Sequence, residues 1–315
     1  MGKPFPRVLV LLATHNGFSW LPEQTGSLLR QQDVDLKLLI SDDASSDGTG
    51  AWLKNLAASD SRVTLLPTAG PFGSAAKNFY RLLKDADWEG AQYVAFSDQD
   101  DIWHHDKLAR SIALLESQGA DAVSSNVVAV WPDGCRALVH KAQPQRKFDY
   151  LFEAAGPGCT YVMTVAFARE VRLQVDKLVA LGRGLPAHHD WFCYALCRAR
   201  GGKWLMDAVP TMEYRQHGGN EVGANSGARA ARQRFMKIRS GWYRTEVLFM
   251  LRVSRESKPA DPRLKVLALR LERGNFWDRC LLALQASQFR RRWRDRMALA
   301  FFFLSAWFWG GRQPS

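Results

Sequence analysis

The sequence has few cysteines, and none of them belongs to a CxxC pair. There are five, an odd number, which argues against a disulfide framework or a zinc ribbon and is typical of a reducing compartment. Long apolar runs are also missing, since the run at residues 8–13 is too short for the core of a signal peptide. We therefore expect the functional site to face the cytosol.

Two glycine-rich fingerprints are absent as well. No GxGxxG follows the first apolar run, and no GxxxxGK[ST] occurs in the chain. These patterns carry the phosphate contacts of dinucleotide dehydrogenases and P-loop enzymes, so both classes are disfavoured. The chain has no repeat and no low-complexity tract, and its 47% hydrophobic and 23% charged residues are typical of a folded protein.

What the chain does contain is an alternation of short apolar runs with helical patterns. Each run is followed by a turn and then by apolar residues at helical spacing, which predicts an α/β fold with a mostly parallel sheet. The predicted strands cover residues 8–13, 36–41, 63–66, 93–96, 122–125 and 127–130. Asp133 and Gly134 predict a hairpin turn. In sheets of this kind, ligands bind beyond the carboxyl ends of the strands.

The stretch from Tyr93 to Leu108 is the most informative. Its strand leads directly into Asp98, Asp100 and Asp101, three carboxylates that repel one another unless a cation lies between them. A hard divalent cation, Mg²⁺ or Mn²⁺, prefers carboxylate oxygens and keeps positions open for phosphate oxygens. The alternative is an acidic turn that caps the next helix.

A second pair of carboxylates, Asp42 and Asp43, follows the second predicted strand. These side chains can accept hydrogen bonds from ribose hydroxyls and base N–H groups, and Asp47 is then available to cap the following helix. The alternative is that residues 42–49 form only a capping turn rich in Ser, Asp and Gly.

Positive charge is concentrated at the C-terminal end. Residues 226–315 carry a net charge of +14, which leaves −2 for residues 1–225. This part has a helical pattern and ends in an apolar, aromatic-rich segment, residues 297–309, shorter than the ~20 residues that cross a bilayer. Cations beside such a helix favour the surface of an anionic membrane. Nucleic-acid binding and a self-packing helical cap are the alternatives.

Seven motifs, taken in order, carry a resemblance to a known family. They read ATHNG, SDDASSDGT, GSAAKNF, SDQDDIW followed by DKL, GPGCTYVM, HHDW and YRQHGGNEVGAN. The chain resembles glycosyltransferase family 2, whose members have a GT-A fold with a Rossmann-like nucleotide-binding half. Within that family it is similar to bacterial rhamnosyltransferases of surface-polysaccharide synthesis. The resemblance covers residues 7–225.

The resemblance implies roles for individual residues. It implies a donor-nucleotide site formed by Thr14, Asn16, Asp42, Asp43, Lys77 and Asp98, a divalent cation held by Asp100 of the DxD motif with His217 beside it, and a catalytic base, Asp190. The alternative for Asp190 is a helix N-cap, and for His217 a surface histidine without a role. A zinc site of His188, His189 and His217 is disfavoured because adjacent side chains point in different directions.

The sequence thus predicts a metal-dependent, inverting glycosyltransferase. Residues 1–225 would form the GT-A domain and residues 226–315 a basic helical region, peripheral on the cytoplasmic face of the inner membrane. The expected donor is dTDP-L-rhamnose and the expected acceptor a hydroxyl of a lipid-linked glycan, with no nucleic acid as partner. The rivals are a UDP-hexose donor on the same fold, a basic nucleic-acid-binding protein, and a catalytically silent membrane scaffold.

Overall fold

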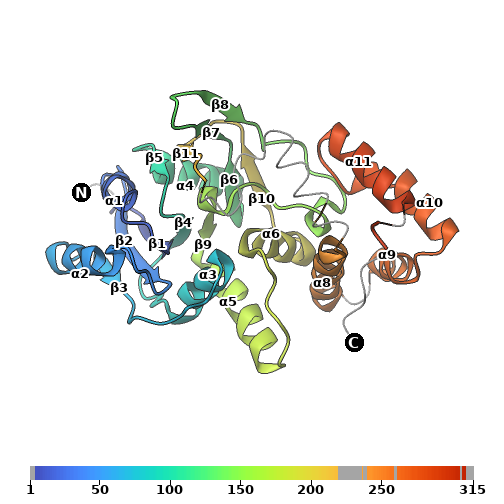
Figure 1. Ribbon diagram of the computed structural model, residues 1–315, viewed down its shortest axis with the longest axis horizontal. Helices are drawn as coiled ribbons and strands as arrows, with labels where there is room; N and C mark the ends of the chain where they lie inside the picture. Colours follow the sequence, from blue (N-terminus) through green and yellow to red (C-terminus); the bar gives the residue numbers. More distant parts are fainter. Residues whose placement is uncertain (1–3, 219–235, 237–239, 259–260, 306, 310–315) are drawn as a thin grey trace. The chain divides into compact units, whose positions relative to one another are not determined.

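The computed structural model describes residues 4–218, 236, 240–258, 261–305 and 307–309, and the chain folds into two compact units (Figure 1). The first unit comprises Met1–Ala142, Gly156–Asp190 and Lys203–Glu221, and the second comprises Gln143–Ala155, Trp191–Gly202 and Val222–Ser315. Two internal segments therefore group with the C-terminal helices, which hydrophobic periodicity alone does not reveal. The predicted domain boundary between residues 225 and 226 lies outside the described residues and stays a prediction.

The first unit is built on a seven-stranded sheet with the strand order β10-β6-β9-β4-β1-β2-β3. Its strands are β1 (Arg7–Thr14), β2 (Asp35–Asp42), β3 (Val63–Leu65), β4 (Tyr93–Ser97), β6 (Ala122–Ser125), β9 (Val162–Thr164) and β10 (Trp204–Asp207). Strand β1 pairs in parallel with β2 and β4, β2 with β3, and β6 with β10, while β9 runs antiparallel to both of its neighbours. The prediction of an α/β fold with a mostly parallel sheet is confirmed.

Helices cover both faces of this sheet because successive strand residues point to opposite sides. They are α1 (Leu21–Leu29), α2 (Thr49–Ser59), α3 (Ala75–Asp85), α4 (Lys107–Gln118) and α5 (Val165–Ala180). Val8, Val10 and Leu12 pack in one buried cluster with apolar residues of α1, α2 and α4. On the other face α3 contacts β1, and its Phe79 packs on Phe96 of β4 with 5.1 Å between ring centroids. The fully buried strands explain their nearly continuous apolar sequence.

A smaller sheet in the first unit has the order β5-β11-β7-β8. Its strands are β5 (Ile102–Trp103), β7 (Val127–Val130), β8 (Arg136–Val139) and β11 (Met212–Arg215). Strands β7 and β8 pair antiparallel with Val130 opposite Arg136, so the hairpin predicted at Asp133 and Gly134 is present. Strand β5 follows the acidic stretch and pairs with β11, which brings the segment before His217 back toward the end of β4.

The register of the main sheet positions the polar clusters. Thr14 lies opposite Asp42 at the ends of β1 and β2, and Leu12 lies opposite Ser97 at the end of β4. The carboxyl ends of three adjacent strands therefore meet at one edge, where the candidate ligand-binding residues follow.

The second unit is helical. It contains most of α6 (His189–Arg200), whose first two residues belong to the first unit, together with α8 (Trp242–Ser257), α9 (Pro262–Arg273), α10 (Phe276–Leu284) and α11 (Trp293–Leu304). Helices α9 and α10 are separate because Gly274, which has a positive φ of 57°, ends α9 and the side chain of Asn275 caps α10. A side chain at Gly274 would clash with the ring of Trp309.

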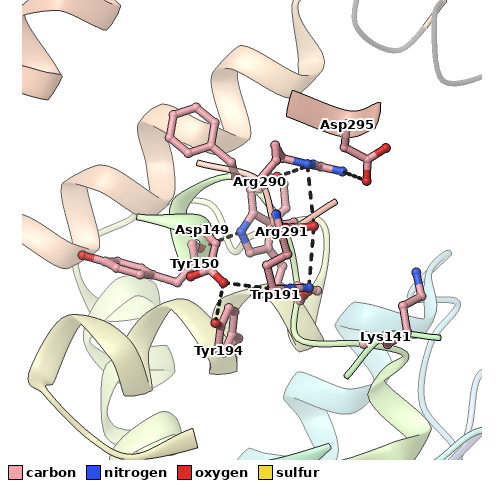
Figure 2. Close-up of polar contacts among 12 residues, drawn as sticks. Lys141, Asp149, Tyr150, Trp191, Tyr194, Arg290, Arg291 and Asp295 are labelled. Atoms are coloured by element: carbon pink, nitrogen blue, oxygen red, sulfur yellow. Dashed lines mark hydrogen bonds and ion pairs between the residues drawn. The ribbon is translucent and has the colours of Figure 1, made fainter. Parts of the chain in front are cut away.

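A buried ionic network holds this unit together around Asp149, whose side chain is fully buried (Figure 2). Its carboxylate accepts hydrogen bonds from the Tyr194 hydroxyl at 3.0 Å, from Arg291 at 3.2 Å and from Arg198 at 3.3 Å. Burial of an ion pair is favourable only when the remaining donors and acceptors are satisfied. Because Asp149 receives three charged or polar donors, the network fixes the segment before α11 against residues 149–151 and α6.

The predicted basic tail is helical where it is described. Several of its predicted cations, namely Arg229, Arg232, Arg234, Lys237 and Arg239, lie outside the described residues. In the part of the chain that the structure describes, no helix is both long and apolar enough to cross a membrane.

Candidate active site

The loops after β1 and β2 are tied together by Asp42. Its carboxylate accepts hydrogen bonds from the Thr14 hydroxyl at 2.9 Å, from the Ser45 hydroxyl at 2.5 Å and from the Ser45 backbone N–H at 3.1 Å. The residue is 9% exposed. Since both oxygens are occupied by protein donors, Asp42 organises the loop that presents its neighbours to a ligand.

Asp43 is anchored in a different way. It accepts hydrogen bonds from the backbone N–H groups of Phe72 and Gly73, so it holds the Gly70–Gly73 turn. Its own carbonyl oxygen lies 2.8 Å from Nδ1 of His15. The turn predicted between the third strand and its helix is thus connected to the carboxyl edge of the sheet.

Asn16 lies at the tip of the loop after β1 in a left-handed conformation, with φ at 48°. Its side-chain oxygen accepts a hydrogen bond from the Ser46 backbone N–H at 2.8 Å, and its backbone N–H donates to the Ser45 hydroxyl at 2.8 Å. Asn16 is exposed, and an asparagine tolerates this conformation better than most residues. Thr14, Asn16, Asp42 and Asp43 therefore converge, as the sequence predicts.

Lys77 lies in the first turn of α3 and is exposed. Its backbone N–H donates to the Ser74 hydroxyl, which caps the helix. The next residue, Asn78, is buried and donates to the carbonyl oxygens of Thr14 and Ser41 at 3.2 and 2.9 Å. This places the start of α3 beside the ends of β1 and β2 and leaves the side chain of Lys77 facing solvent.

Gln99, the middle residue of the DxD motif, links the acidic stretch to the loop after β1. Its side-chain oxygen accepts a hydrogen bond from the His15 backbone N–H at 2.8 Å, and its side-chain nitrogen donates to the His15 carbonyl at 2.9 Å. A methyl group on Gly17 would lie 2.3 Å from the same side-chain oxygen. Gly17 therefore lets the amide of Gln99 approach the backbone, a role that sequence reasoning missed.

Asp98 and Asp101 form the acidic part of the site with Cys159. Single ligand atoms of the three side chains lie within 4.8 Å of one another, which makes this the one metal-sized cluster among the described His, Cys, Asp and Glu residues. Burial and the charges of Asp100 and Asp98 raise the pKa of Asp101 well above its usual range. The thiol of Cys159 is also fully buried, which raises its pKa and keeps it protonated, so it is a poor ligand for a hard cation.

Asp101 is a buried acidic residue of this site whose carboxyl oxygens have no well-aligned hydrogen-bond donor. Its side chain is fully buried, and its nearest polar neighbours, the Cys159 thiol and the backbone of Arg215, are not in full hydrogen-bond geometry with either carboxylate oxygen. A buried carboxylate in this state is unfavourable unless it is protonated or a cation balances its charge. The oxygen-rich donor set therefore fits Mg²⁺ or Mn²⁺.

Asp100 and His217 are brought together across the two sheets. Nε2 of His217 lies 2.7 Å from Oδ2 of Asp100. The imidazole stacks on the indole of Trp20 with 4.7 Å between ring centroids and an interplanar angle of 13°. The guanidinium of Arg215 lies 5.4 Å from the centre of the Trp20 ring and forms an ion pair with Glu23 at 2.9 Å. Trp20 and Arg215 thus position the predicted ligands. Arg215 belongs to the motif that contains His217, whereas no motif in the sequence indicated Trp20.

Lys107 lies beneath the acidic stretch and is fully buried. Its ammonium donates to the Thr160 carbonyl at 3.3 Å and lies 4.3 Å from the centre of the Trp103 ring. Burial lowers the pKa of Lys107 to about 8. This lysine connects the start of α4 to the 3₁₀ turn Gly158–Thr160.

The same turn brings Asp190 close to the acidic residues. A side chain on Gly158 would place its Cβ 2.6 Å from Nε2 of His189 and 3.3 Å from Cβ of Asp190. Cys159, the next residue, belongs to the cluster with Asp98 and Asp101. The predicted base, in the first turn of α6, therefore lies against Gly158, and the residue after Gly158 belongs to the acidic cluster.

His189 is a packing residue rather than a ligand. Its ring stacks on Phe79 at 4.0 Å and meets the edge of Phe96 at 5.1 Å. Burial lowers the pKa of His189 to about 4, so it is neutral at neutral pH. The zinc site that the sequence disfavours would require the His189 ring as a ligand. This ring packs between the aromatic rings of Phe79 and Phe96, which offer no further metal ligand.

The depressed pKa of His189 makes a prediction about pH. Its unfolded value is near 6.5, so between pH 6.5 and about 4 the unfolded chain binds a proton that the folded chain does not. The unfolding free energy of the first unit should therefore fall with decreasing pH, by about 3 kcal/mol from this group. Denaturant titrations of the wild type and of His189→Gln should show a steeper pH dependence in the wild type. Equal slopes would contradict it.

A mostly parallel sheet whose carboxyl edge combines a nucleoside-sized polar loop, an acidic cluster and a helix-borne carboxylate defines a nucleotide-sugar glycosyltransferase with a GT-A fold. Residues 9–158 match the family described as glycosyl transferase family 2. The chain is 45% identical over 240 residues to the dTDP-rhamnosyl transferase RfbG of Shigella flexneri, which covers 75% of this chain and 82% of that protein. The chain belongs to glycosyltransferase family 2.

Further similarities agree with this assignment. The chain is 30% identical over 159 residues, 50% of its length, to the glucosyltransferase WfgD of Escherichia coli, of which 59% is covered. The structure of S. aureus TarS 1–349 in complex with UDP-GlcNAc has a TM-score of 0.51 at 15% identity, covering 97% of this chain and 92% of that one. The mannosyltransferase PcManGT of Pyrobaculum calidifontis has a TM-score of 0.50 at 18% identity, covering 98% and 88%. The two structures show the fold alone.

Proposed function

We propose that this glycosyltransferase transfers L-rhamnose from dTDP-L-rhamnose, with inversion at the anomeric carbon, to a hydroxyl of a lipid-linked glycan during surface-polysaccharide synthesis. The observation that supports the proposal is that Gly158 lies against Asp190, while the next residue, Cys159, belongs to the acidic cluster with Asp98 and Asp101. An in-line displacement would use Asp190 as the base and the carboxylates to hold the departing diphosphate through a cation. The 45% identity to RfbG supports the choice of donor.

The donor nucleotide would be held at the edge of β1, β2 and β4. Thr14, Asn16 and Asp43 lie together there and would contact the base and ribose, while Asp42 keeps their loop in place. Asp98 would bind ribose or sugar hydroxyls. Lys77 is solvent-facing in the absence of ligand, and a long flexible cation of this kind can reach a bound phosphate.

A divalent cation would be held by Asp100 and His217, with Asp98 and Asp101 contributing further negative charge. When bound, it would neutralise the charge that develops on the departing dTDP. His217 is already aligned with Asp100 by its stack on Trp20, so little reorganisation of these two side chains is needed.

Asp190 would perform the proton transfer. The acceptor oxygen forms a bond to C1 of the sugar while the bond from C1 to the diphosphate oxygen breaks, and the acceptor proton moves to the Asp190 carboxylate. Asp190 is half-buried in the first turn of α6. The close approach of Gly158 to this helix start would hold the base in position.

The donor choice is testable by binding. Thymidine and uridine nucleotides differ in the base methyl group and the ribose 2′-hydroxyl, so a pocket fitted to the methyl and without a partner for the hydroxyl prefers dTDP. Calorimetry in the presence of Mn²⁺ should show dTDP binding at least about tenfold more tightly than UDP. Hydrolysis of dTDP-rhamnose should likewise exceed that of UDP-glucose.

The opposite preference would identify the second candidate, a UDP-hexose transferase, which the 30% identity to the UDP-glucose-using WfgD supports. In that outcome the fold and the base would be retained and the proposed donor abandoned. Absence of turnover with every nucleotide sugar tested would instead support a catalytically silent scaffold.

A further inference from the structure

Two neighbouring helices of the second unit expose large apolar side chains in regular rows. The exposed residues of α10 are Phe276, Trp277, Leu281 and Leu284, and those of α11 and the turn after it are Trp293, Met297, Phe301, Leu304 and Trp307. Trp277, Leu281 and Leu284 of α10 and Trp293, Met297, Phe301 and Leu304 of α11 recur at intervals of three or four residues, so each row occupies one face, and Phe276 lies beside Trp277. The two helices pack against each other. We name this set of residues the aromatic face.

The aromatic face is the outer surface of these helices. Their other faces are used for packing within the unit: Leu282 of α10 and Phe303 of α11 are fully buried. Trp277 is 74% exposed, Leu284 80% and Trp293 67%. Monomeric soluble proteins rarely expose so many large apolar side chains on two helices that pack together, so these rows indicate a binding partner.

The charges around the aromatic face indicate the chemistry of that partner. Among the exposed charged residues of the described stretch 262–305 and 307–309, five are cationic and one is acidic. They are Arg263, Lys265, Arg273, Arg292, Arg294 and the acidic Glu272. Arg263 and Arg273 pair with Asp261 and Asp278, whereas Arg292 and Arg294 flank Trp293 directly. A second copy of this chain would oppose like charges, while an anionic lipid surface is complementary to them.

We propose that the aromatic face of α10 and α11 adsorbs to the surface of an anionic phospholipid bilayer. Helix α10 has 9 residues and α11 has 12, so they are about 14 and 18 Å long and cannot cross a hydrocarbon core of about 30 Å. Aromatic and aliphatic side chains on one face with arginines at the edge suit a position in the interface. The link between this surface and a lipid-linked acceptor rests on the proposed function. The surface itself is inferred from the exposed residues of α10 and α11 alone.

The test uses the full chain and vesicle sedimentation. Wild-type protein should bind vesicles containing about one third phosphatidylglycerol at least about tenfold better than pure phosphatidylcholine vesicles. Two double variants, Trp277→Glu with Leu281→Glu and Trp293→Glu with Met297→Glu, should each lose about tenfold or more of this binding. The matched control is Leu173→Glu with Val179→Glu on α5, where the side chains are 67% and 52% exposed, and it should bind like the wild type.

The control carries the same change of net charge as the test variants. Equal loss of binding in all three would show that charge alone acts, and unchanged binding in the test variants would remove the aromatic face from the role. A wild-type dimer in light scattering that Trp277→Glu converts to monomer would overturn the proposal in favour of self-association. If circular dichroism shows that a test variant does not fold, a measurement on the wild type replaces it: quenching of tryptophan fluorescence by brominated lipids in anionic vesicles. Absence of quenching would overturn the proposal.

Failure of this inference is separable from failure of the proposed function. Hydrolysis of dTDP-rhamnose without vesicles should be the same in wild type and in the face variants, because these residues are outside the donor site. Vesicle binding without any nucleotide-sugar turnover would contradict the function alone. Turnover without vesicle binding would contradict only the membrane surface.

Discussion

Replacing Asp190 by asparagine should lower glycosyl transfer by about 10²–10⁴-fold, the usual contribution of a positioned general base. Asparagine has nearly the same shape as aspartate but cannot accept the proton of the incoming hydroxyl. Asp190 lies in the first turn of α6 against Gly158, and the residue after Gly158 belongs to the acidic cluster. Affinity for dTDP, measured by calorimetry with Mn²⁺, should change little if, as proposed, the loops after β1 and β2 bind the nucleotide.

The control for this substitution is Asp176→Asn on α5. Asp176 is 44% exposed and forms a long ion pair of 3.9 Å with Arg172, so its loss should affect neither transfer nor binding. A drop in kcat with an unchanged dissociation constant for dTDP would identify Asp190 as the base. Full transfer activity in Asp190→Asn would exclude it, and equal loss of binding and transfer would indicate a structural role at the helix start.

Much of the first unit could be predicted from local sequence. Strands such as Tyr93–Ser97 are fully buried, and a nearly continuous apolar run bounded by turn residues is the signature of such a strand. Because parallel strands end at the same edge, Thr14, Asp42 and Asp98 could be placed near one another before any contact was known. The prediction succeeded where a short segment determines both the element and the position of its polar end.

The supporting contacts of the site could not be predicted in this way. Gln99 bonds to the backbone of His15, 84 residues earlier in the chain, and Trp20 stacks on His217. Neither pairing leaves a periodic pattern, because a single glutamine or tryptophan in a loop has no repeat to detect. A signal for Lys107 was available, since a lysine in the DKL motif directly follows an acidic run, but its burial depends on Trp103 and Thr160 from other segments.

The second unit shows a further limit. Asp149 and Arg291 are 142 residues apart, yet they form an ion pair in which both side chains are almost completely buried. In the sequence Arg290, Arg291 and Arg292 form one basic run, yet the side chain of Arg291 is 4% exposed and fixes the segment before α11. A charge run alone does not reveal which of its members are internal. Arg292 and Arg294, by contrast, are exposed.

Removal of the Asp100 carboxylate is expected to be the second most damaging change. Asp100→Asn should weaken Mn²⁺ binding and Mn²⁺-dependent dTDP binding by about 10²-fold or more. A residue that binds the metal directly contributes at least as much to metal affinity as the residues that hydrogen-bond to the ligands. Asp100 is 7% exposed, and its Oδ2 lies 2.7 Å from Nε2 of His217. Because water has little access to this position, solvent cannot compensate for the lost negative charge. Mn²⁺ affinity can be measured directly by electron paramagnetic resonance, independently of turnover.

Asp106→Asn provides the matched control, six positions further along the same stretch. Asp106 is exposed, lies at the start of α4 and makes no side-chain capping bond, so its loss should leave Mn²⁺ and dTDP affinity unchanged. Trp20→Ala should give an intermediate result, since His217 would keep its ligand atom but lose the stacked ring that aligns it with Asp100. If the wild type bound dTDP equally well with Mn²⁺ and with excess chelator, the carboxylates at this edge would bind the donor without a cation. Asp101 would then have to be stabilised by protonation, in keeping with the direction in which burial moves its pKa.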